Sequence, residues 1–86
     1  MLQEDEALLN VTFSGENGEL PDPVAFDSTD GDVLQWATEA IRAGGVPGIA
    51  ANQGVNLEGF VVDRFPSKED QPNRMFIRPK TPFGED

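Results

Sequence analysis

The chain of 86 residues contains no cysteine and no histidine. Without cysteine it forms no disulfide and carries no thiolate, which favours an intracellular, cytoplasmic protein. Without histidine it lacks the side chain that proteins use most often as a general base and as a transition-metal ligand. We therefore expect a protein that is not an enzyme and that needs no cofactor or metal.

Long apolar runs and positive charge are also scarce. No stretch is long and apolar enough to span a membrane, and no secretory signal is visible. Six basic residues stand against sixteen acids, and the first of them, Arg42, follows ten of those acids. Binding to the phosphates of a nucleic acid is therefore not expected. The net charge of −10 is typical of a protein that charge keeps in solution, or of an acidic surface that meets a basic protein partner.

The stretch from Thr29 to Pro47 carries the clearest helix signal. Thr29 and Asp32 have the spacing of a capping box at the start of a helix. Gly44 or Gly45 can end the helix, and the proline that follows prevents it from resuming. The acids near the helix start lack the spacing of an EF-hand loop, so we expect capping and not calcium binding. One apolar face is formed by Val33, Trp36, Ala37, Ala40 and Ile41.

A hairpin is predicted before this helix. The alternating segment from Leu8 to Phe13 is typical of a half-buried strand. Asn17 and Gly18 are the pair that a two-residue type I′ turn favours, because both positions need a positive φ. The returning arm, residues 20–27, contains two prolines and is therefore expected to be an edge strand. Counting outward from the turn pairs Val11 with Val24 and Leu9 with Phe26.

The rest of the chain predicts a glycine-rich connection and two further strands. The connection, residues 44–59, lacks the Lys-Ser or Lys-Thr pair of a phosphate-binding loop. Its apolar residues Ile49, Val55 and Leu57 are expected to tuck under the sheet. Strands are predicted for residues 60–65 and 74–78. In the last strand Met75 and Ile77 share one side, and Arg74, Phe76 and Arg78 share the other.

These elements predict one α+β domain with a mixed sheet of four or five strands and one helix across one face. The domain is expected to cover residues 8–80, after a flexible acidic arm at 1–7 and before a mobile tail at 81–86. The predicted core contains Leu9, Val11, Val24, Phe26, Val33, Trp36, Ala40, Ile41, Met75 and Ile77.

The order of elements, ββαββ, resembles the β-grasp fold of ubiquitin and its bacterial relatives. Gly45, Val46 and Pro47, directly after the helix, are similar to the Gly-Ile-Pro of ubiquitin. The last strand is also similar to that of ubiquitin when Gly84 is laid on its terminal glycine. The resemblance implies a single ubiquitin-like domain.

The same alignment implies roles for four residues. Phe76 and Arg78 occupy outward positions that contribute to the partner-binding patch of ubiquitin. Lys80 falls on a tail arginine that the activating enzyme of ubiquitin recognises. Gly84 becomes a candidate conjugation point, although a single glycine followed by two acids departs from the Gly-Gly end of ubiquitin. A peptidase would first have to remove these acids; the alternative is that Gly84 is an ordinary glycine in a disordered tail.

The function implied is that of a monomeric ubiquitin-like modifier or protein-binding module. Its partners would be an activating enzyme, a peptidase and target proteins. The alternative is a β-grasp accessory subunit of a larger assembly that is never conjugated. Phe76 between two arginines would be an exposed aromatic of the kind enriched at interface hot spots. Alternatively, the long connection, residues 48–57, covers it.

Overall fold

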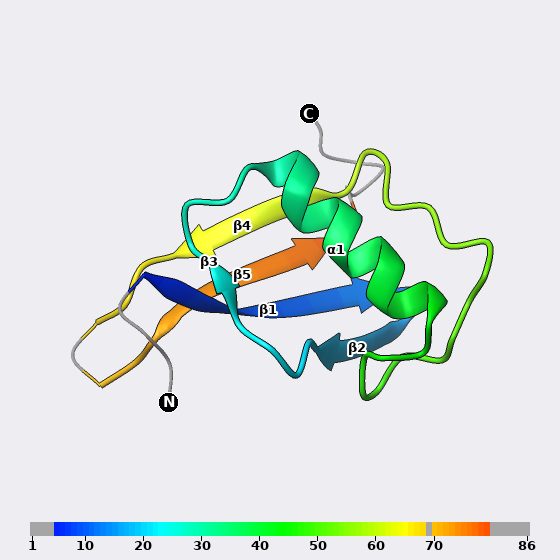
Figure 1. Ribbon diagram of the computed structural model, residues 1–86, viewed down its shortest axis with the longest axis horizontal. Helices are drawn as coiled ribbons and strands as arrows, with labels where there is room; N and C mark the ends of the chain where they lie inside the picture. The colour runs from blue at the N-terminus through cyan, green and yellow to red at the C-terminus, as the bar shows by residue number, and fades with distance from the viewer. Residues whose placement is uncertain (1–4, 69, 80–86) are drawn as a thin grey trace.

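The computed structural model describes residues 5–68 and 70–79. They form a small α+β domain in which one helix lies across one face of a mixed five-stranded sheet (Figure 1). The strand order is β2-β1-β5-β4, and β3 pairs with β1 next to β2. The elements are β1 Glu6–Phe13, β2 Glu16–Glu19, β3 Val24–Ala25, α1 Asp30–Arg42, β4 Val61–Phe65 and β5 Asn73–Arg78. β1 thus includes the last two residues, Glu6 and Ala7, of the arm expected at 1–7.

The centre of the sheet is a parallel pair, β1 with β5, which brings the first and the last strand of the described chain side by side. In this pair Leu9 lies opposite Met75, and Val11 lies opposite Ile77. β4 pairs with β5 antiparallel and forms one edge of the sheet. The predicted mixed sheet is confirmed.

The first hairpin turns earlier than the sequence predicts. The turn residues are Ser14 and Gly15, with φ of 54° and 79°, the positive values that a type I′ turn requires. The predicted turn at Asn17 and Gly18 is wrong, because both residues lie in β2 and pair with β1. Gly18 is needed in the strand for a different reason: a Cβ there would lie 2.1 Å from the carbonyl oxygen of Pro47.

This earlier turn also changes the register of the returning arm. Val24 pairs with Ala7 and not with its predicted partner Val11. The predicted pairing of Leu9 with Phe26 is wrong for the same reason. The arm forms two pieces, β2 and β3, because the two prolines between them cannot donate to a strand ladder. Its predicted place at the edge of the sheet is confirmed.

The helix starts and ends where the sequence predicts. The Thr29 hydroxyl accepts a hydrogen bond of 3.1 Å from the backbone N–H of Asp32, which satisfies one free amide of the first turn. After Arg42 the chain leaves the helix through Gly44, whose φ is 74°, and Gly45 N–H donates to the carbonyl of Ala40. These contacts satisfy groups that a helix end leaves unpaired.

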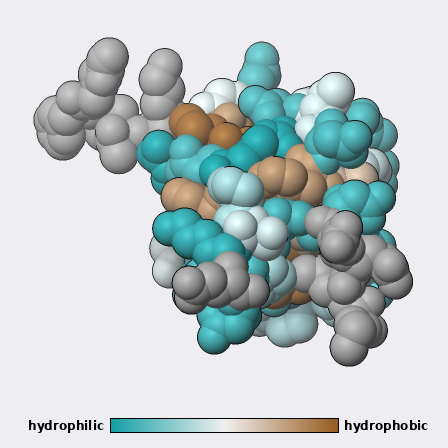
Figure 2. Space-filling view, turned by 90° about the vertical axis from the view of Figure 1, so that its left-hand side faces the viewer, coloured by the Kyte–Doolittle hydropathy of each residue, from teal (hydrophilic) through white to brown (hydrophobic). Residues whose placement is uncertain are grey.

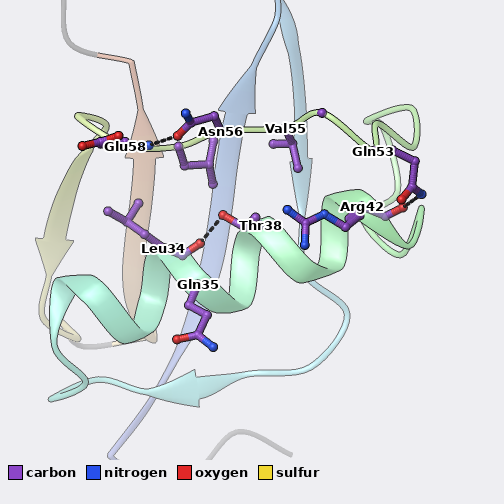
Figure 3. Close-up of a pocket in the computed structure, with 10 residues that line it drawn as sticks. Leu34, Gln35, Thr38, Arg42, Gln53, Val55, Asn56 and Glu58 are labelled. Carbon is purple, nitrogen blue, oxygen red and sulfur yellow. Dashed lines mark hydrogen bonds between the residues drawn. The ribbon is translucent and has the colours of Figure 1, made fainter.

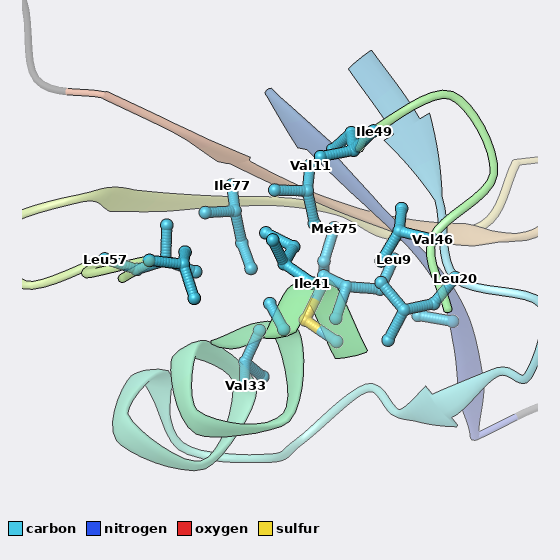
Figure 4. Packing of buried hydrophobic residues seen from close by; sticks show 13 residues of the cluster. Leu9, Val11, Leu20, Val33, Ile41, Val46, Ile49, Leu57, Met75 and Ile77 are labelled. Carbon is cyan, nitrogen blue, oxygen red and sulfur yellow. The ribbon is translucent and has the colours of Figure 1, made fainter. Parts of the chain in front are cut away.

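The core lies between α1 and the sheet (Figure 4). The helix contributes Val33, Ala37 and Ile41 to it. As predicted, the long connection adds Ile49, Val55 and Leu57, which are nearly inaccessible to solvent. The remaining buried apolar residues are Ala7, Leu9, Val11, Leu20, Val46, Met75 and Ile77.

Trp36 is a correction to the predicted core, because 38% of it is exposed. The buried residues of α1 recur every fourth position, which makes a narrow stripe centred near Ala37. At about 100° per residue, Trp36 lies about one quarter turn from that centre. Ala40 lies closer to the centre and is half-buried. Val24 and Phe26 are also only partly buried, at the margin of the core.

Candidate protein-interaction site

The face of the sheet that α1 leaves uncovered carries the outward residues of β1, β4 and β5. Residues paired across neighbouring strands point to the same side. One row therefore contains Asn10, Phe76 and Asp63. The next row contains Leu8, Arg74 and Phe65, and a third contains Arg78 and Val61. We call these eight residues, together with Thr12, Asn17 and Lys68, the open face.

The predicted division of β5 into two sides is confirmed. Met75 and Ile77 are fully buried in the core, while Arg74 and Arg78 are exposed and Phe76 is half-buried. The open face is hollowed, with a volume of about 630 Å³ above β1, β4 and β5.

Two phenylalanines line this hollow from neighbouring strands. The rings of Phe65 and Phe76 meet edge to face, with centroids 5.4 Å apart and an angle of 78°. Phe65 is 52% exposed. The guanidinium of Arg74 lies 5.8 Å from the centre of the Phe76 ring, within the range of a cation–π contact. The alternative that residues 48–57 cover Phe76 is wrong, because the apolar residues of that connection pack into the core on the other face.

The charged side chains of the hollow are mostly basic. Arg78 Nε donates to Asp63 Oδ2 at 2.6 Å, across the β4–β5 pair. Arg74 and Lys68 line the same hollow, and neither forms an ion pair with another residue that the structure describes. Within the part of the chain that the structure describes, no acid neutralises these two cations.

A small polar cluster borders the aromatic pair on the β1 side. The amide groups of Asn10 and Asn17 donate to each other, at 2.7 and 3.2 Å. Asn17 Nδ2 also donates to the Thr12 hydroxyl at 2.9 Å. These bonds fix the orientation of three polar side chains that line the hollow, so their free lone pairs and N–H groups are positioned for a ligand.

The structure brings together only part of the site predicted from the sequence. Phe76 and Arg78 lie on the outward side of β5, as the alternation predicts, and line the hollow. Lys80 and Gly84 lie outside the described residues. Sequence reasoning did not include Phe65 or Lys68. The alternation within β4 places Phe65 on one of two sides, but only the register with β5 shows that this side is the open face.

A second hollow of about 520 Å³ lies between α1 and the long connection (Figure 3). Its polar groups are largely used within the chain: Gln53 donates to the carbonyl of Arg42, and Thr38 donates to that of Leu34. The Asn56 side chain accepts from the backbone N–H of Glu58. Of these hydrogen bonds, the one from Gln53 to Arg42 joins the connection to the helix, and the other two lie within the helix and within the connection.

Within residues 5–68 and 70–79, no three acidic side chains gather closely enough to hold a metal ion. The 13-residue helix of this described part is too short to cross a membrane. Figure 2 views the molecule from the end at which the segment between β4 and β5 lies, and shows mainly hydrophilic residues with small hydrophobic areas between them.

Comparison with known proteins gave no relationship from which a function could be transferred. No family model matches the chain, and neither a curated protein nor a solved structure is significantly similar to it.

Proposed function

We propose that the chain is a small ubiquitin-like protein of β-grasp architecture that binds other proteins through its open face. The strand order β2-β1-β5-β4, the parallel central pair and the single helix across one face support the β-grasp assignment. The observation that carries the binding function is the Phe65–Phe76 pair, held in a hollow and flanked by Arg74.

An exposed aromatic pair of this kind favours a protein partner. Burying aromatic rings gives a large hydrophobic gain, and aromatic and arginine side chains dominate binding hot spots. Phe65 and Phe76 are fixed on paired strands, so a partner would not have to order a loop to contact them. The half-exposed Phe65 supplies the area that a partner would cover.

Site-specific photo-crosslinking in the native cell tests this function. A photoreactive phenylalanine analogue replaces Phe65 in one variant and Gln35, an exposed residue of α1, in the control. We expect a discrete covalent adduct from position 65 that is weak or missing from position 35. An adduct of equal yield from both positions, or none from position 65, would contradict binding through the open face.

Conjugation through Gly84 is a separate version of the proposal and has its own test. A chain that ends at Gly84 is incubated with ATP and an activating enzyme encoded near its gene. A modifier forms an adenylate and then a thioester under these conditions. A chain that forms neither, yet still gives the adduct at position 65, acts as a non-conjugated binding module or accessory subunit.

A further inference from the structure

Positive charge is concentrated on one side of this acidic protein. Of the five basic residues that the structure describes, Lys68, Arg74 and Arg78 line the open-face hollow. Among the described residues that line it, Asp63 is the one acid, so the lining carries two more positive than negative charges in a chain of net charge −10.

The other two described basic residues lie elsewhere. Arg64 lies between Asp63 and Phe65 in β4, so its side chain points to the opposite, helix side of the sheet. There it donates to Asp30 and to the carbonyl of Phe26. Arg42 lies in the last turn of α1, next to the second hollow. Among the described residues, the combination of basic and aromatic side chains is therefore confined to the open face.

We infer that the open face binds a short, extended acidic segment of a partner protein, an inference that rests on the proposed function. Carboxylates of the segment would meet Arg74 and Lys68, which have no ion-pair partner among the described residues. An apolar side chain between those carboxylates would pack on Phe65 and Phe76. Exposed backbone groups of the segment would hydrogen-bond to the Asn10–Asn17 cluster.

The size of the basic area argues for a short segment and against a nucleic acid. Charges are screened over about 8 Å at physiological ionic strength, so the hollow attracts anions only close to it. A longer polyanion would extend beyond the hollow over a surface with excess negative charge. Arginine also pairs in a planar, two-pronged way with carboxylates, which a peptide can present between apolar residues.

A pair of synthetic peptides tests the inference by NMR titration of the ¹⁵N-labelled chain. The probe is a capped pentapeptide with two acids on each side of a central phenylalanine. The control replaces each acid with its amide. We expect the acidic peptide to shift resonances of β1, β4 and β5 with a dissociation constant of about 1 mM or below. The control should bind at least about tenfold more weakly.

Charge reversal locates the contact. Arg74→Glu and Lys68→Glu should each weaken binding of the acidic peptide by about tenfold, whereas Arg42→Glu on the helix should leave it nearly unchanged. The spectra of all three variants show directly whether each remains folded. Peptides that bind equally well, shifts confined to α1 and the second hollow, or tighter binding by a single-stranded oligonucleotide at the same face would each overturn the inference.

These outcomes separate the inference from the proposed function. If the peptides fail but the adduct at position 65 still forms in cells, the open face binds a protein by other chemistry. If the acidic peptide binds as expected but no adduct forms, the chemistry of the face is as inferred and the proposed cellular function is wrong.

Discussion

The two faces of the sheet are built from the same strands but differ in burial: one packs against the helix, and the other is open. Along β5, Met75 and Ile77 are fully buried beneath the helix. Arg74 and Phe76, which alternate with them in the sequence, line the open hollow on the other face. β4 repeats this division, with Arg64 on the helix side and Phe65 on the open side. A strand alternates its side chains with a period of two, so substitutions at adjacent positions should separate stability from binding.

The largest expected effect contrasts neighbours on β5. Ile77→Ala leaves a cavity in the core and should lower the free energy of unfolding by about 2–5 kcal/mol. Phe76→Ala removes a half-buried ring from the open face and should cost about 1 kcal/mol. Urea unfolding followed by Trp36 fluorescence measures both. Equal losses for the two variants would show that the faces do not differ as described.

A second contrast tests how the hairpin meets the connection after the helix. Gly18→Ala places a methyl group 2.1 Å from the Pro47 carbonyl oxygen, and the backbone shift required should cost about 1–3 kcal/mol. The matched control is Gly31→Ala, whose added Cβ meets only the Thr29 hydroxyl oxygen, at 4.0 Å. Since alanine favours a helix, the control should be neutral or stabilising by up to about 1 kcal/mol. Thermal unfolding that ranks Gly31→Ala as the more damaging change would refute this contact.

A third contrast compares the arginines on the two faces. Arg64 holds three contacts on the helix side, to Asp30, Phe26 and Met75. Arg64→Ala should therefore cost about 1–2 kcal/mol. Arg78 makes one exposed ion pair, so Arg78→Ala should cost less than about 1 kcal/mol. Chemical denaturation of both variants at low and high salt measures the two losses in the free energy of unfolding. A larger loss for Arg78→Ala than for Arg64→Ala would contradict this order and show that the open-face ion pair is important for stability.

The smallest expected effect concerns the start of the helix. Thr29→Ala removes the side-chain acceptor of the Asp32 amide and should cost about 1 kcal/mol. Thr29→Ser keeps the acceptor and should restore most of that loss. Binding at the open face should be the same in both variants, because Thr29 lies outside it. If Thr29→Ala binds more weakly under conditions in which it is fully folded, the separation of the two faces would be contradicted.

The sequence predicted what depends on local pattern. The capped helix, the two sides of β5 and the buried residues of the connection follow from periodicity and from capping residues. The hairpin register was missed because two residue pairs can turn the chain. In the structure Ser14 and Gly15 make the turn, and Gly18 lies in the strand close to Pro47, a contact between distant segments that no local pattern reveals. Trp36 was wrongly placed in the core because its hydrophobicity and spacing suggested a wide buried face on the helix. The face that the structure buries is narrower and consists of Val33, Ala37 and Ile41.

The candidate site was predictable in part for the same reason. Outward positions on β5 gave Phe76 and Arg78, since alternation needs no partner strand. Phe65 joins them only through the β4–β5 register, and Asn10 only through the parallel pairing of β1 with β5. These pairings join segments far apart in the chain, so single-sequence patterns do not fix them.

Thiol labelling measures the division between the two faces most directly, because the chain has no cysteine of its own. Phe76→Cys and Ile77→Cys each introduce one thiol at adjacent positions, and their modification rates under native conditions are compared with the rates in urea. We predict rapid labelling at position 76 in the folded protein. At position 77 we predict labelling at least about a hundredfold slower, limited by opening of the core. Equal native rates at the two positions, in variants shown to be folded, would contradict the separation of a buried face from an open face.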